Sequence, residues 1–280
     1  MSAYVLGIDG GGTKTRAIIL DQDGKVCGSG IAGPSNYDDL GVEAAYANVS
    51  AAVEHARGQA SLEASPFDAV FLGMAGVVSE ADHAVIRTMA ERLNLSAQVG
   101  VDHDCRIGLA GGLSGRPGIV LIAGTGSSCY GRRADGQNWR SGGWGGLLAD
   151  EGGAYWFGVQ AMQAAVRAYD GRGPMTTLLP AVQAALKIDD LNDIMHRVYV
   201  QTMTRTDIAT LAPLVTQAAH AKDTIALMLL ERGAVELAAC VTAVAAHLEM
   251  REAEVVLVGG MFEVGDLLPL HTLLDETHFS

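Results

Sequence analysis

The chain of 280 residues contains little cysteine. Its four cysteines are Cys27, Cys105, Cys129 and Cys240, and no two of them form a CxxC pair. Structural zinc sites and iron–sulfur clusters need suitably spaced cysteine ligands, and small secreted domains need a disulfide framework. The spacing therefore argues against structural zinc, a cluster and a disulfide scaffold, and it favours a reducing compartment.

Positive charge is also scarce. The 19 Lys and Arg residues face 32 Asp and Glu residues, which gives a formal net charge of −13 at pH 7. Nucleic acid and anionic membranes bind basic surfaces, so we expect neither as a partner. A nucleotide still fits, because backbone amides, a lysine and a metal ion can meet its phosphates.

Long apolar runs are absent as well. No uncharged stretch reaches the roughly 18 residues of a membrane span, and no basic-then-apolar leader opens the chain. We therefore expect a cytoplasmic protein. The apolar share of 49% and the length of 280 residues suit a globular chain with two domains, each with its own core.

The most informative segment is residues 4–15, YVLGIDGGGTKT. An apolar strand ends in Asp9, three glycines and a Thr-Lys-Thr follow, and a second apolar run begins at once. Such a hairpin leaves backbone amides and hydroxyls available to an anion, although an ordinary glycine-rich hairpin is the alternative. The candidate phosphate-binding residues are Gly11, Gly12, Thr13 and Lys14.

Two better-known phosphate loops do not fit this segment. A Walker A loop needs adjacent Gly and Lys and then a helix, whereas Thr13 separates Gly12 from Lys14 and β-branched residues follow. A Rossmann fingerprint needs a third glycine that opens a helix, and Thr15 stands at that place.

A second copy of the pattern appears in residues 120–127, VLIAGTGS. An offset of 112 residues places Gly12 on Gly124 and the hairpin turn Asp23-Gly24 on Asp135-Gly136. Two such units predict a duplicated architecture with domains 1–115 and 116–280, in which the two phosphate loops face each other across a cleft. The candidate residues of the second loop are Gly124, Thr125 and Gly126.

The order of elements predicts an α/β fold. Residues 1–101 read as β-β-β-α-β-α-β, with helices at 42–60 and 80–93 and a last strand at 97–101, which indicates a mixed sheet covered by helices. From Ala154 onward the chain reads as helical, with methionine and leucine stripes in the core. The helices are expected at 154–169, 176–186, 189–198, 207–221 and 223–249.

Asp104 follows the predicted strand 97–101 directly. An acid at the carboxyl edge of a strand in an α/β sheet can lie beside a ligand and accept a hydroxyl proton as a general base. It can equally cap the next helix, and the local sequence leaves both readings open. We expect His103 to be a surface or hydrogen-bonded histidine. Asn36 lies in a turn, where it bonds its own backbone or points its amide into the cleft.

The segment 139–153 surrounds Trp144 with glycines and then presents Asp150. A flat apolar face beside a hydroxyl acceptor suits a sugar, whereas the alternative is a core tryptophan with Asp150 capping the next helix. The last predicted strand, 254–258, runs into Gly259 and Gly260, where a nucleobase could approach the backbone.

Together the motifs DGGGTKT, VDHDC, IAGTGSSC, GGWGGLLADEGGAYW and VVLVGG resemble the N-acetylglucosamine kinase/BadF-BcrA-type ATPase family, within the actin-like ATPase and sugar kinase superfamily. The resemblance covers nearly the whole chain. It implies two RNase H-like domains, with ATP and the acceptor sugar in the cleft between them.

The resemblance also implies roles. Thr13 and Thr125 would contact ATP phosphates, Gly260 would lie beside the adenosine, Asp9 would organise Mg²⁺ and Asp104 would be the catalytic base. The implied sugar-binding positions are Asn36, Asp104, Ser128, Gly143, Trp144, Gly145 and Asp150.

Two departures from the family pattern bear on these roles. Vertebrate N-acetylglucosamine kinases carry Asn at the position of Ser128, which leaves the exact hexosamine open. Relatives usually continue several dozen residues past the Gly-Gly turn, so we expect that a chain ending at Ser280 is either cut or lacks the helix that closes the first domain.

The implied reaction is ATP-dependent phosphorylation of the 6-hydroxyl of N-acetylglucosamine, giving N-acetylglucosamine 6-phosphate and ADP, in a chain that can form a homodimer. The alternatives are a kinase for glucosamine or N-acetylmuramic acid, an ATPase activator of acyl-CoA dehydratases or reductases, and a non-catalytic sugar sensor. The cysteines are not placed like the cluster ligands of the activators.

Overall fold

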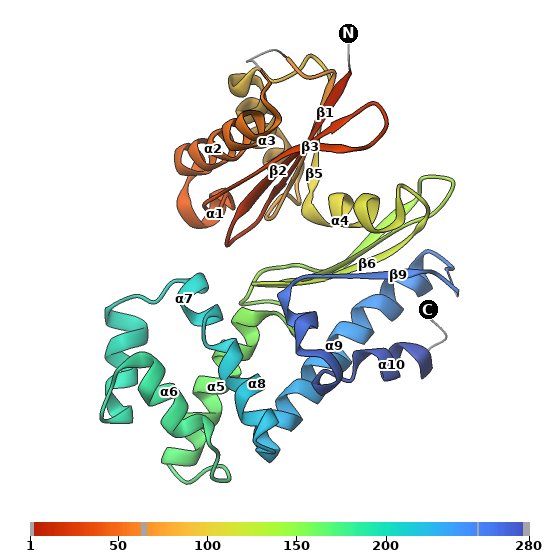
Figure 1. The fold of residues 1–280 in the computed structure, drawn as a ribbon. Coiled ribbons are helices and arrows are strands. Elements are labelled where there is room, and N and C mark those ends of the chain that lie inside the picture. Colours follow the sequence, from red (N-terminus) through yellow and green to blue (C-terminus); the bar gives the residue numbers. More distant parts are fainter. Residues whose placement is uncertain (1–2, 63–65, 251, 277–280) are drawn as a thin grey trace. The chain divides into compact units, whose positions relative to one another are not determined.

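The computed structural model describes residues 3–62, 66–250 and 252–276. The chain divides into two compact units between Ile107 and Gly108, and each unit has its own sheet and its own hydrophobic core (Figure 1). The division falls inside helix α4 (Asp104–Leu113). The domain boundary at residues 115 and 116 stays a prediction.

The first unit is built on a five-stranded mixed sheet with the order β3-β2-β1-β4-β5. Strands β1 and β2, and β2 and β3, pair antiparallel, whereas β1, β4 and β5 run parallel. The predicted order of elements is confirmed. The strands are β1 (Tyr4–Gly10), β2 (Thr15–Asp21), β3 (Val26–Ala32), β4 (Ala69–Met74) and β5 (Val99–His103), and the helices are α1 (Tyr37–Leu40), α2 (Val42–Ala60) and α3 (Glu80–Leu93).

Helix α2 packs very closely on β2 and β3 (Figure 1). Its facing side is lined by the fully buried Ala52 and Ala56, and the strand presents glycines to it. A Cβ placed on Gly30 would lie 2.0 Å from the carbonyl oxygen of Ala52, and one on Gly28 would lie 2.3 Å from that of Ala56. Small residues on both sides therefore set the distance between helix and sheet.

The second unit repeats the start of the first. Its sheet has the order β8-β7-β6-β9, in which β6 pairs antiparallel with β7 and parallel with β9. The hairpin turns correspond too, because Gly24 and Gly136 have φ angles of 76° and 91°. The predicted duplication is confirmed in these four strands: β6 (Gly118–Ala123), β7 (Ser127–Arg132), β8 (Asn138–Gly142) and β9 (Val255–Val258).

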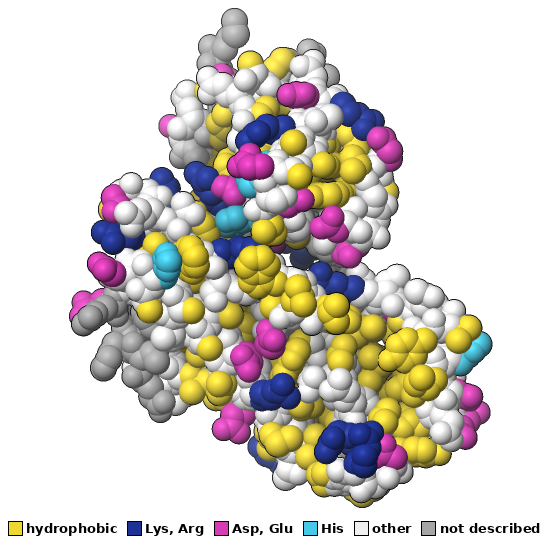
Figure 2. Space-filling view, turned by 180° about the vertical axis from the view of Figure 1, so that it is seen from behind, with side chains coloured by type: hydrophobic (Ala, Val, Ile, Leu, Met, Phe, Trp, Pro, Cys, Tyr) yellow, Lys and Arg dark blue, Asp and Glu magenta, His cyan; other side chains and the backbone are white. Residues whose placement is uncertain are grey.

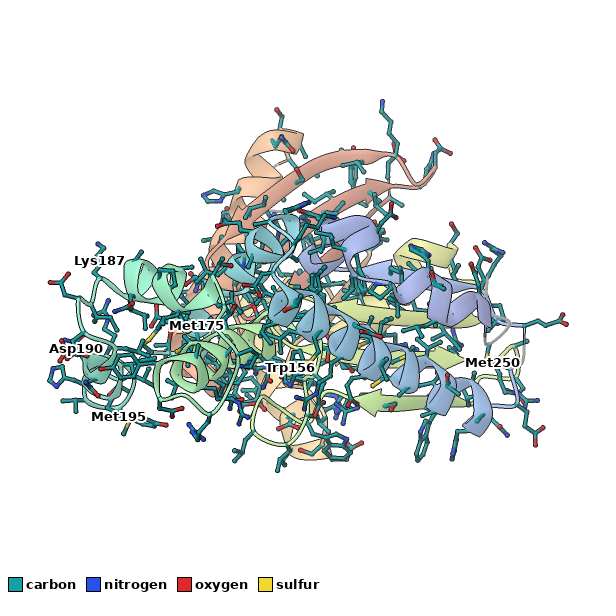
Figure 3. All side chains as sticks on the ribbon, turned by 90° about the horizontal axis from the view of Figure 1, so that it is seen from below. Trp156, Met175, Lys187, Asp190, Met195 and Met250 are labelled. Carbon is teal, nitrogen blue, oxygen red and sulfur yellow. The ribbon has the colours of Figure 1, made fainter. Side chains whose placement is uncertain are left out.

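Helices form most of the rest of the second unit, and the longest, α9, covers its sheet (Figure 1). Trp156 on α5 is buried and packs edge-on against Phe157, with 4.9 Å between the ring centroids (Figure 3). The α-helices are α5 (Ala154–Tyr169), α6 (Leu178–Leu186), α7 (Arg205–Ala209), α8 (Ala212–His220), α9 (Thr224–His247) and α10 (Leu270–Glu276), and a 3₁₀ segment spans Gly260–Leu267.

Two of the helices expected from the sequence were wrong. The helix at 189–198 is not α-helical: a 3₁₀ turn at Leu191–Asp193 is started by Asp190, and a π-helix spans His196–Val200. The helix at 207–221 is split, because Pro213 has no amide to continue α7 and instead stands in the first turn of α8.

The methionine stripes are also only partly core. Met175 and Met195 are 75% and 62% exposed (Figure 3), while Met162 and Met261 are buried. Met175 lies outside the helices and Met195 directly precedes the π-helix, whereas Met228 is 54% exposed although it lies within α9.

Surface charge is mixed. Figure 2 shows acidic and basic side chains interspersed over the face that it presents.

Among the described residues, no helix combines the length and the apolar character that a bilayer span requires.

The close packing of α2 predicts a large cost for Gly30→Ala. The added methyl would overlap a backbone carbonyl that cannot move without shifting the helix, so we expect a loss of about 3 kcal/mol in the free energy of unfolding. Gly7→Ala on β1 is the matched control, because a Cβ there meets nothing within 4 Å. Urea denaturation measures both, and an equal, small loss in the two variants would contradict this packing.

Candidate functional site

The first phosphate loop is a tight turn between β1 and β2. The amide of Gly11 donates to the carbonyl of Lys14 at 3.0 Å, and the amide of Ser35 donates to the carbonyl of Gly11 at 3.0 Å. The buried Thr15 hydroxyl donates to the carbonyl of Gly33 at 2.7 Å. The loop is thus fixed from behind by residues 33–35, while Thr13 and Lys14 are exposed.

The parallel strands bring two acids to one edge of the first sheet. Asp9 on β1 is level with Gly73 on β4, and Gly73 is level with Asp102 on β5. Asp104 follows β5 directly. Because carboxyl ends of parallel strands share an edge, Asp9 and Asp104 come near each other, and the charge of Asp9 acts on Asp104.

The pKa of Asp104 reflects this setting. Burial, and then the nearby negative charge of Asp9, raise the pKa from 3.8 to about 6, against hydrogen bonds from Cys105 that lower it. Burial also raises the pKa of Asp9, although Arg16 and Lys14 partly offset this effect. A carboxyl group that titrates near neutral pH is suited to accept a proton during a reaction.

The neighbouring Asp102 has a different function. Its carboxylate accepts a hydrogen bond from Arg106 at 2.5 Å and another from the His103 amide at 2.9 Å. Burial raises the pKa of Asp102, but these interactions outweigh it and hold the pKa below its usual value. Asp102 therefore serves as a charged structural anchor.

Strand β5 is shifted from the expected 97–101 to Val99–His103, so that His103 is its last residue.

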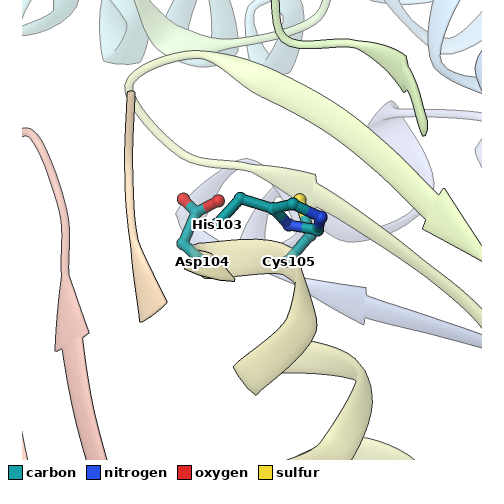
Figure 4. A group of neighbouring side chains, drawn as sticks. All are labelled: His103, Asp104 and Cys105. Carbon is teal, nitrogen blue, oxygen red and sulfur yellow. The ribbon is translucent and has the colours of Figure 1, made fainter. Parts of the chain in front are cut away.

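His103, Asp104 and Cys105 form a group whose potential metal-ligand atoms lie within 4.8 Å of one another (Figure 4). This set mixes nitrogen, oxygen and sulfur donors. Mg²⁺ prefers oxygen donors, so the set as a whole does not suit it. Of the acids at this edge, Asp102 is already paired with Arg106, so Asp9 and Asp104 are the carboxylates suited to hold the ion.

Asn36 bonds its own chain, which is one of the two possibilities that the sequence left open. Its Oδ1 accepts from the Asp38 amide at 3.3 Å, and its Nδ2 donates to Asp39 Oδ2 at 2.9 Å. It caps the short helix α1 and is only 6% exposed. A role for Asn36 in sugar binding stays a prediction.

The second phosphate loop, between β6 and β7, is hydrogen-bonded to the first turn of helix α5. The amide of Gly124 donates to the carbonyl of Gly126 at 2.9 Å, and the amides of Ala154 and Tyr155 donate to the carbonyls of Gly124 and Thr125 at 2.8 and 2.9 Å. The loop thereby satisfies amides of the first helical turn that would otherwise have no partner.

Asp150 forms an ion pair with Arg205 that sequence reasoning missed. Asp150 is 2% exposed and has a φ of 69°. Burial raises the pKa of Asp150, and Arg205 counteracts this effect. The residue that caps α5 is Gly153, so Asp150 is not the helix cap that the alternative reading proposed. Arg205 is 55 residues away in sequence, and no local signal connects the two.

The glycine-rich loop of the second unit brings several predicted sugar-binding residues together. Trp144 is 62% exposed and is therefore not a core tryptophan. Arg140 Nη1 donates to the carbonyl of Gly143 at 3.0 Å, and its guanidinium lies 5.0 Å from the centre of the Trp144 ring. Gly143 and Gly145 have φ angles of 69° and 84°.

The two glycines of the turn after β9 differ in their surroundings. Gly259 has a φ of 122°, and a Cβ there would lie 2.2 Å from the carbonyl oxygen of Ala123. Gly260 has nothing within 4 Å of its Cβ position. Gly259 is thus required by the fold, whereas the space beside Gly260 is open to a ligand.

The candidate site residues fall into two sets, one in each unit. Within the first unit, the phosphate loop 11–14 and the acids Asp9 and Asp104 lie at the ends of β1 and β5. Within the second unit, the loop 124–126 lies against Asp150, since a Cβ on Gly126 would be 2.5 Å from Asp150 Oδ2. Ser128 lies beside Gly143.

Gly126→Ala should disturb the buried ion pair. The new methyl would lie 2.5 Å from both Asp150 Oδ2 and Arg205 Nη2, and separating buried charges costs about 3 kcal/mol. Gly124→Ala is the control in the same loop, because its Cβ position has no neighbour within 4 Å. Thermal unfolding should show a drop of several degrees for Gly126→Ala alone, and equal melting temperatures would refute the arrangement.

The raised pKa of Asp104 predicts a pH-dependent stability. The folded state holds the proton more tightly than the unfolded state, so this contribution is fully present below pH 3.8 and is lost as the pH rises through about 6. Between pH 4 and 7, denaturation should show a decrease about 2 kcal/mol larger for the wild type than for Asp104→Asn. Parallel profiles for the two proteins would contradict this pKa.

Comparisons with known proteins agree with this geometry. The family model described as the BadF/BadG/BcrA/BcrD ATPase family matches residues 6–279. The chain is 35% identical to the N-acetylmuramic acid/N-acetylglucosamine kinase of Clostridium acetobutylicum over 91% of this chain and 83% of that protein. It is 30% identical to the N-acetyl-D-glucosamine kinase of Dictyostelium discoideum over 80% and 74% of the two chains.

A crystal structure supports the same grouping. A candidate N-acetylglucosamine kinase of Chromobacterium violaceum superposes with a TM-score of 0.82 at 29% identity, covering 97% of this chain and 93% of that one. The predicted α/β fold of two domains, as in actin-like ATPases and sugar kinases, is confirmed. The chain belongs to the BadF/BadG/BcrA/BcrD ATPase family.

Proposed function

We propose that this protein is an ATP-dependent hexosamine kinase that transfers the γ-phosphoryl group to the 6-hydroxyl of N-acetylglucosamine. The observation that carries the proposal is Asp104, a carboxyl group with a pKa of about 6 at the end of β5. The chain also resembles proteins that are named as kinases of amino sugars.

ATP is held by the backbone of the two hairpin loops. The first loop contributes Gly11, Gly12, Thr13 and Lys14, and the second contributes Gly124, Thr125 and Gly126. Both loops are braced by hydrogen bonds from neighbouring segments, so their amides keep a fixed direction when phosphate arrives. The open space at Gly260 receives the adenosine, while Gly259 keeps the turn in shape.

Mg²⁺ is held through Asp9. Asp9 and Asp104 suit a divalent cation because their negative charges repel each other, as the effect of Asp9 on the pKa of Asp104 shows. A bound cation offsets this repulsion. When bound, the ion neutralises charge on the phosphates of ATP. Asp9 lies beside the first phosphate loop, at the end of the strand that leads into it.

Asp104 acts as the general base. Its carboxylate accepts the proton of the sugar 6-hydroxyl as that oxygen attacks the γ-phosphate, and ADP leaves. Phosphoryl transfer depends mainly on positioning and on charge stabilisation, so the base contributes most by orienting the hydroxyl. Asp102 cannot replace it, because the ion pair with Arg106 holds that carboxylate in place.

The sugar lies on the glycine-rich loop of the second unit. Exposed Trp144 offers a flat face to the sugar ring, and the glycines beside it let the backbone approach the hydroxyls. Asp150 and Arg205 act as one charged pair. The carboxylate of Asp150 accepts a hydrogen bond from a sugar hydroxyl, while the positive charge of Arg205 favours the ionised form of Asp150. Asn36 and Ser128 complete the predicted sugar contacts.

N-acetylmuramic acid stays a possible second acceptor for this chain, since one relative carries both sugars in its name.

The placement of the cysteines disfavours the activator-type ATPase. A cluster shared between subunits needs exposed thiols, whereas Cys105 and Cys129 are buried and Cys27 and Cys240 are half-buried. Formation of a homodimer stays a prediction.

Asp104→Asn tests the role of the base. We expect turnover of N-acetylglucosamine to fall on the order of 10²-fold or more, with ATP binding preserved, because the amide cannot accept the proton. For the wild type, kcat/KM should fall as the pH drops through about 6, where Asp104 becomes protonated. A coupled ADP-release assay measures both.

Asp135→Asn in the exposed β7–β8 turn is the matched control for loss of one negative charge. It should leave turnover and the pH profile unchanged. Near-normal turnover in Asp104→Asn, or a wild-type profile that is flat between pH 5 and 8, would contradict the assignment of Asp104.

A further inference from the structure

The ion pair of Asp150 and Arg205 packs directly on the second phosphate loop. A Cβ built on Gly126 would lie 2.5 Å from Asp150 Oδ2 and 2.5 Å from Arg205 Nη2, so both charged groups touch the backbone of this glycine. The side chain of Asp150 is 3% exposed and that of Arg205 is 28% exposed. The loop that is expected to bind ATP phosphates thus lies beside one negative and one positive charge.

The carboxylate of Asp150 is unfavourable beside bound phosphate. Two negative charges repel each other, and burial strengthens this repulsion because little water screens it. Burial raises the pKa of Asp150, Arg205 lowers it, and the negative charge of Glu151 again raises it. A second carboxylate therefore acts in the same region. The acid at position 150 is nevertheless needed, since it is the predicted hydrogen-bond acceptor for a sugar hydroxyl.

Arg205 has a fixed place beside the loop. Its guanidinium lies 5.8 Å from the centre of the Tyr155 ring, and the amide of Tyr155 donates to the carbonyl of Thr125 at 2.9 Å. Arg205 is also the first residue of α7, which a capping box of Thr204 and Asp207 starts. The cation is therefore held both by its own helix and by the residue that binds the loop, all within the second unit.

We propose that Arg205 is a positioning residue of the ATP site: as the counter-ion of Asp150, it holds the carboxylate in place and cancels its repulsion of the phosphates on the loop 124–126. The site can thereby keep an acid for the sugar next to a loop for ATP. This inference rests on the proposed function, because it concerns the nucleotide of the same reaction. It requires no contact between Arg205 and the phosphates.

The charges predict effects of opposite sign for the two partners. Arg205→Gln leaves the negative charge beside the loop, so the affinity for a non-hydrolysable ATP analogue should fall about 10-fold. Asp150→Asn leaves the positive charge, so the affinity should rise by a similar factor. The double variant has neither charge, and its affinity should return to within about threefold of the wild type. A purely structural role would lower the affinity in both single variants.

Isothermal titration calorimetry measures these affinities without sugar, at constant Mg²⁺ and at about pH 8, which favours the ionised carboxylate. Adenosine carries no phosphate, so its affinity, measured by competition, should be the same in all variants. Arg205→Lys keeps the charge and should bind the analogue within about threefold of the wild type. If Arg205→Gln does not fold, Arg205→Lys, Asp150→Asn and the double variant still test the role of the charge.

The exposed ion pair of Arg172 and Asp170 is the matched control, with 2.6 Å between its charged atoms. Asp170 follows the last residue of α5, whose first turn binds the loop, and a helix of 16 residues is about 24 Å long. Arg172→Gln and Asp170→Asn change the charge in the same way and should leave the affinity for the analogue unchanged.

Two results would overturn the counter-ion role and leave the proposed function intact. One is an affinity for the analogue that falls, or stays the same, in both Arg205→Gln and Asp150→Asn. The other is an equal change for adenosine and for the analogue. A wild type that does not bind the analogue would contradict the proposed function, and the counter-ion role with it.

Discussion

The repulsion between two carboxylates at the edge of one parallel sheet is the interaction on which the account depends. Parallel pairing of β1, β4 and β5 brings Asp9 and Asp104 to the same edge, and Gly73 between them carries no side chain. Burial and the charge of Asp9 raise the pKa of Asp104 to about 6. In the proposed reaction the repulsion would favour a bound cation, and burial together with the repulsion would keep a base ready near neutral pH, which are two needs of phosphoryl transfer.

Each phosphate loop is rigid because its polar atoms are already engaged on the side away from the predicted ligand. Thr15 and Ser35 hold the first loop, and the start of α5 holds the second. The buried pair of Asp150 and Arg205 lies directly against Gly126. The loop that carries Asp150, the loop 124–126 and α7 are thereby connected within one unit, so a change in one affects the geometry of the others.

Much of this could be predicted from the sequence, because the signals were local. The two Gly-Thr turns, the hairpins at Asp23-Gly24 and Asp135-Gly136, and the boundaries of α2, α3 and α5 all depend on neighbouring residues. The Asp150–Arg205 pair joins residues 55 positions apart, so no local pattern in the sequence could reveal it. The π-helix at His196–Val200 follows helical periodicity closely enough to be mistaken for an α-helix.

The most direct test of the central claim identifies the product. The wild-type protein is incubated with Mg-ATP and N-acetylglucosamine, and ³¹P and ¹H NMR locate the transferred phosphate. The account predicts one sugar phosphate per ADP, with phosphorus coupled to the two protons on C6. ADP together with free phosphate and unmodified sugar would show an ATPase without transfer, and would contradict the account.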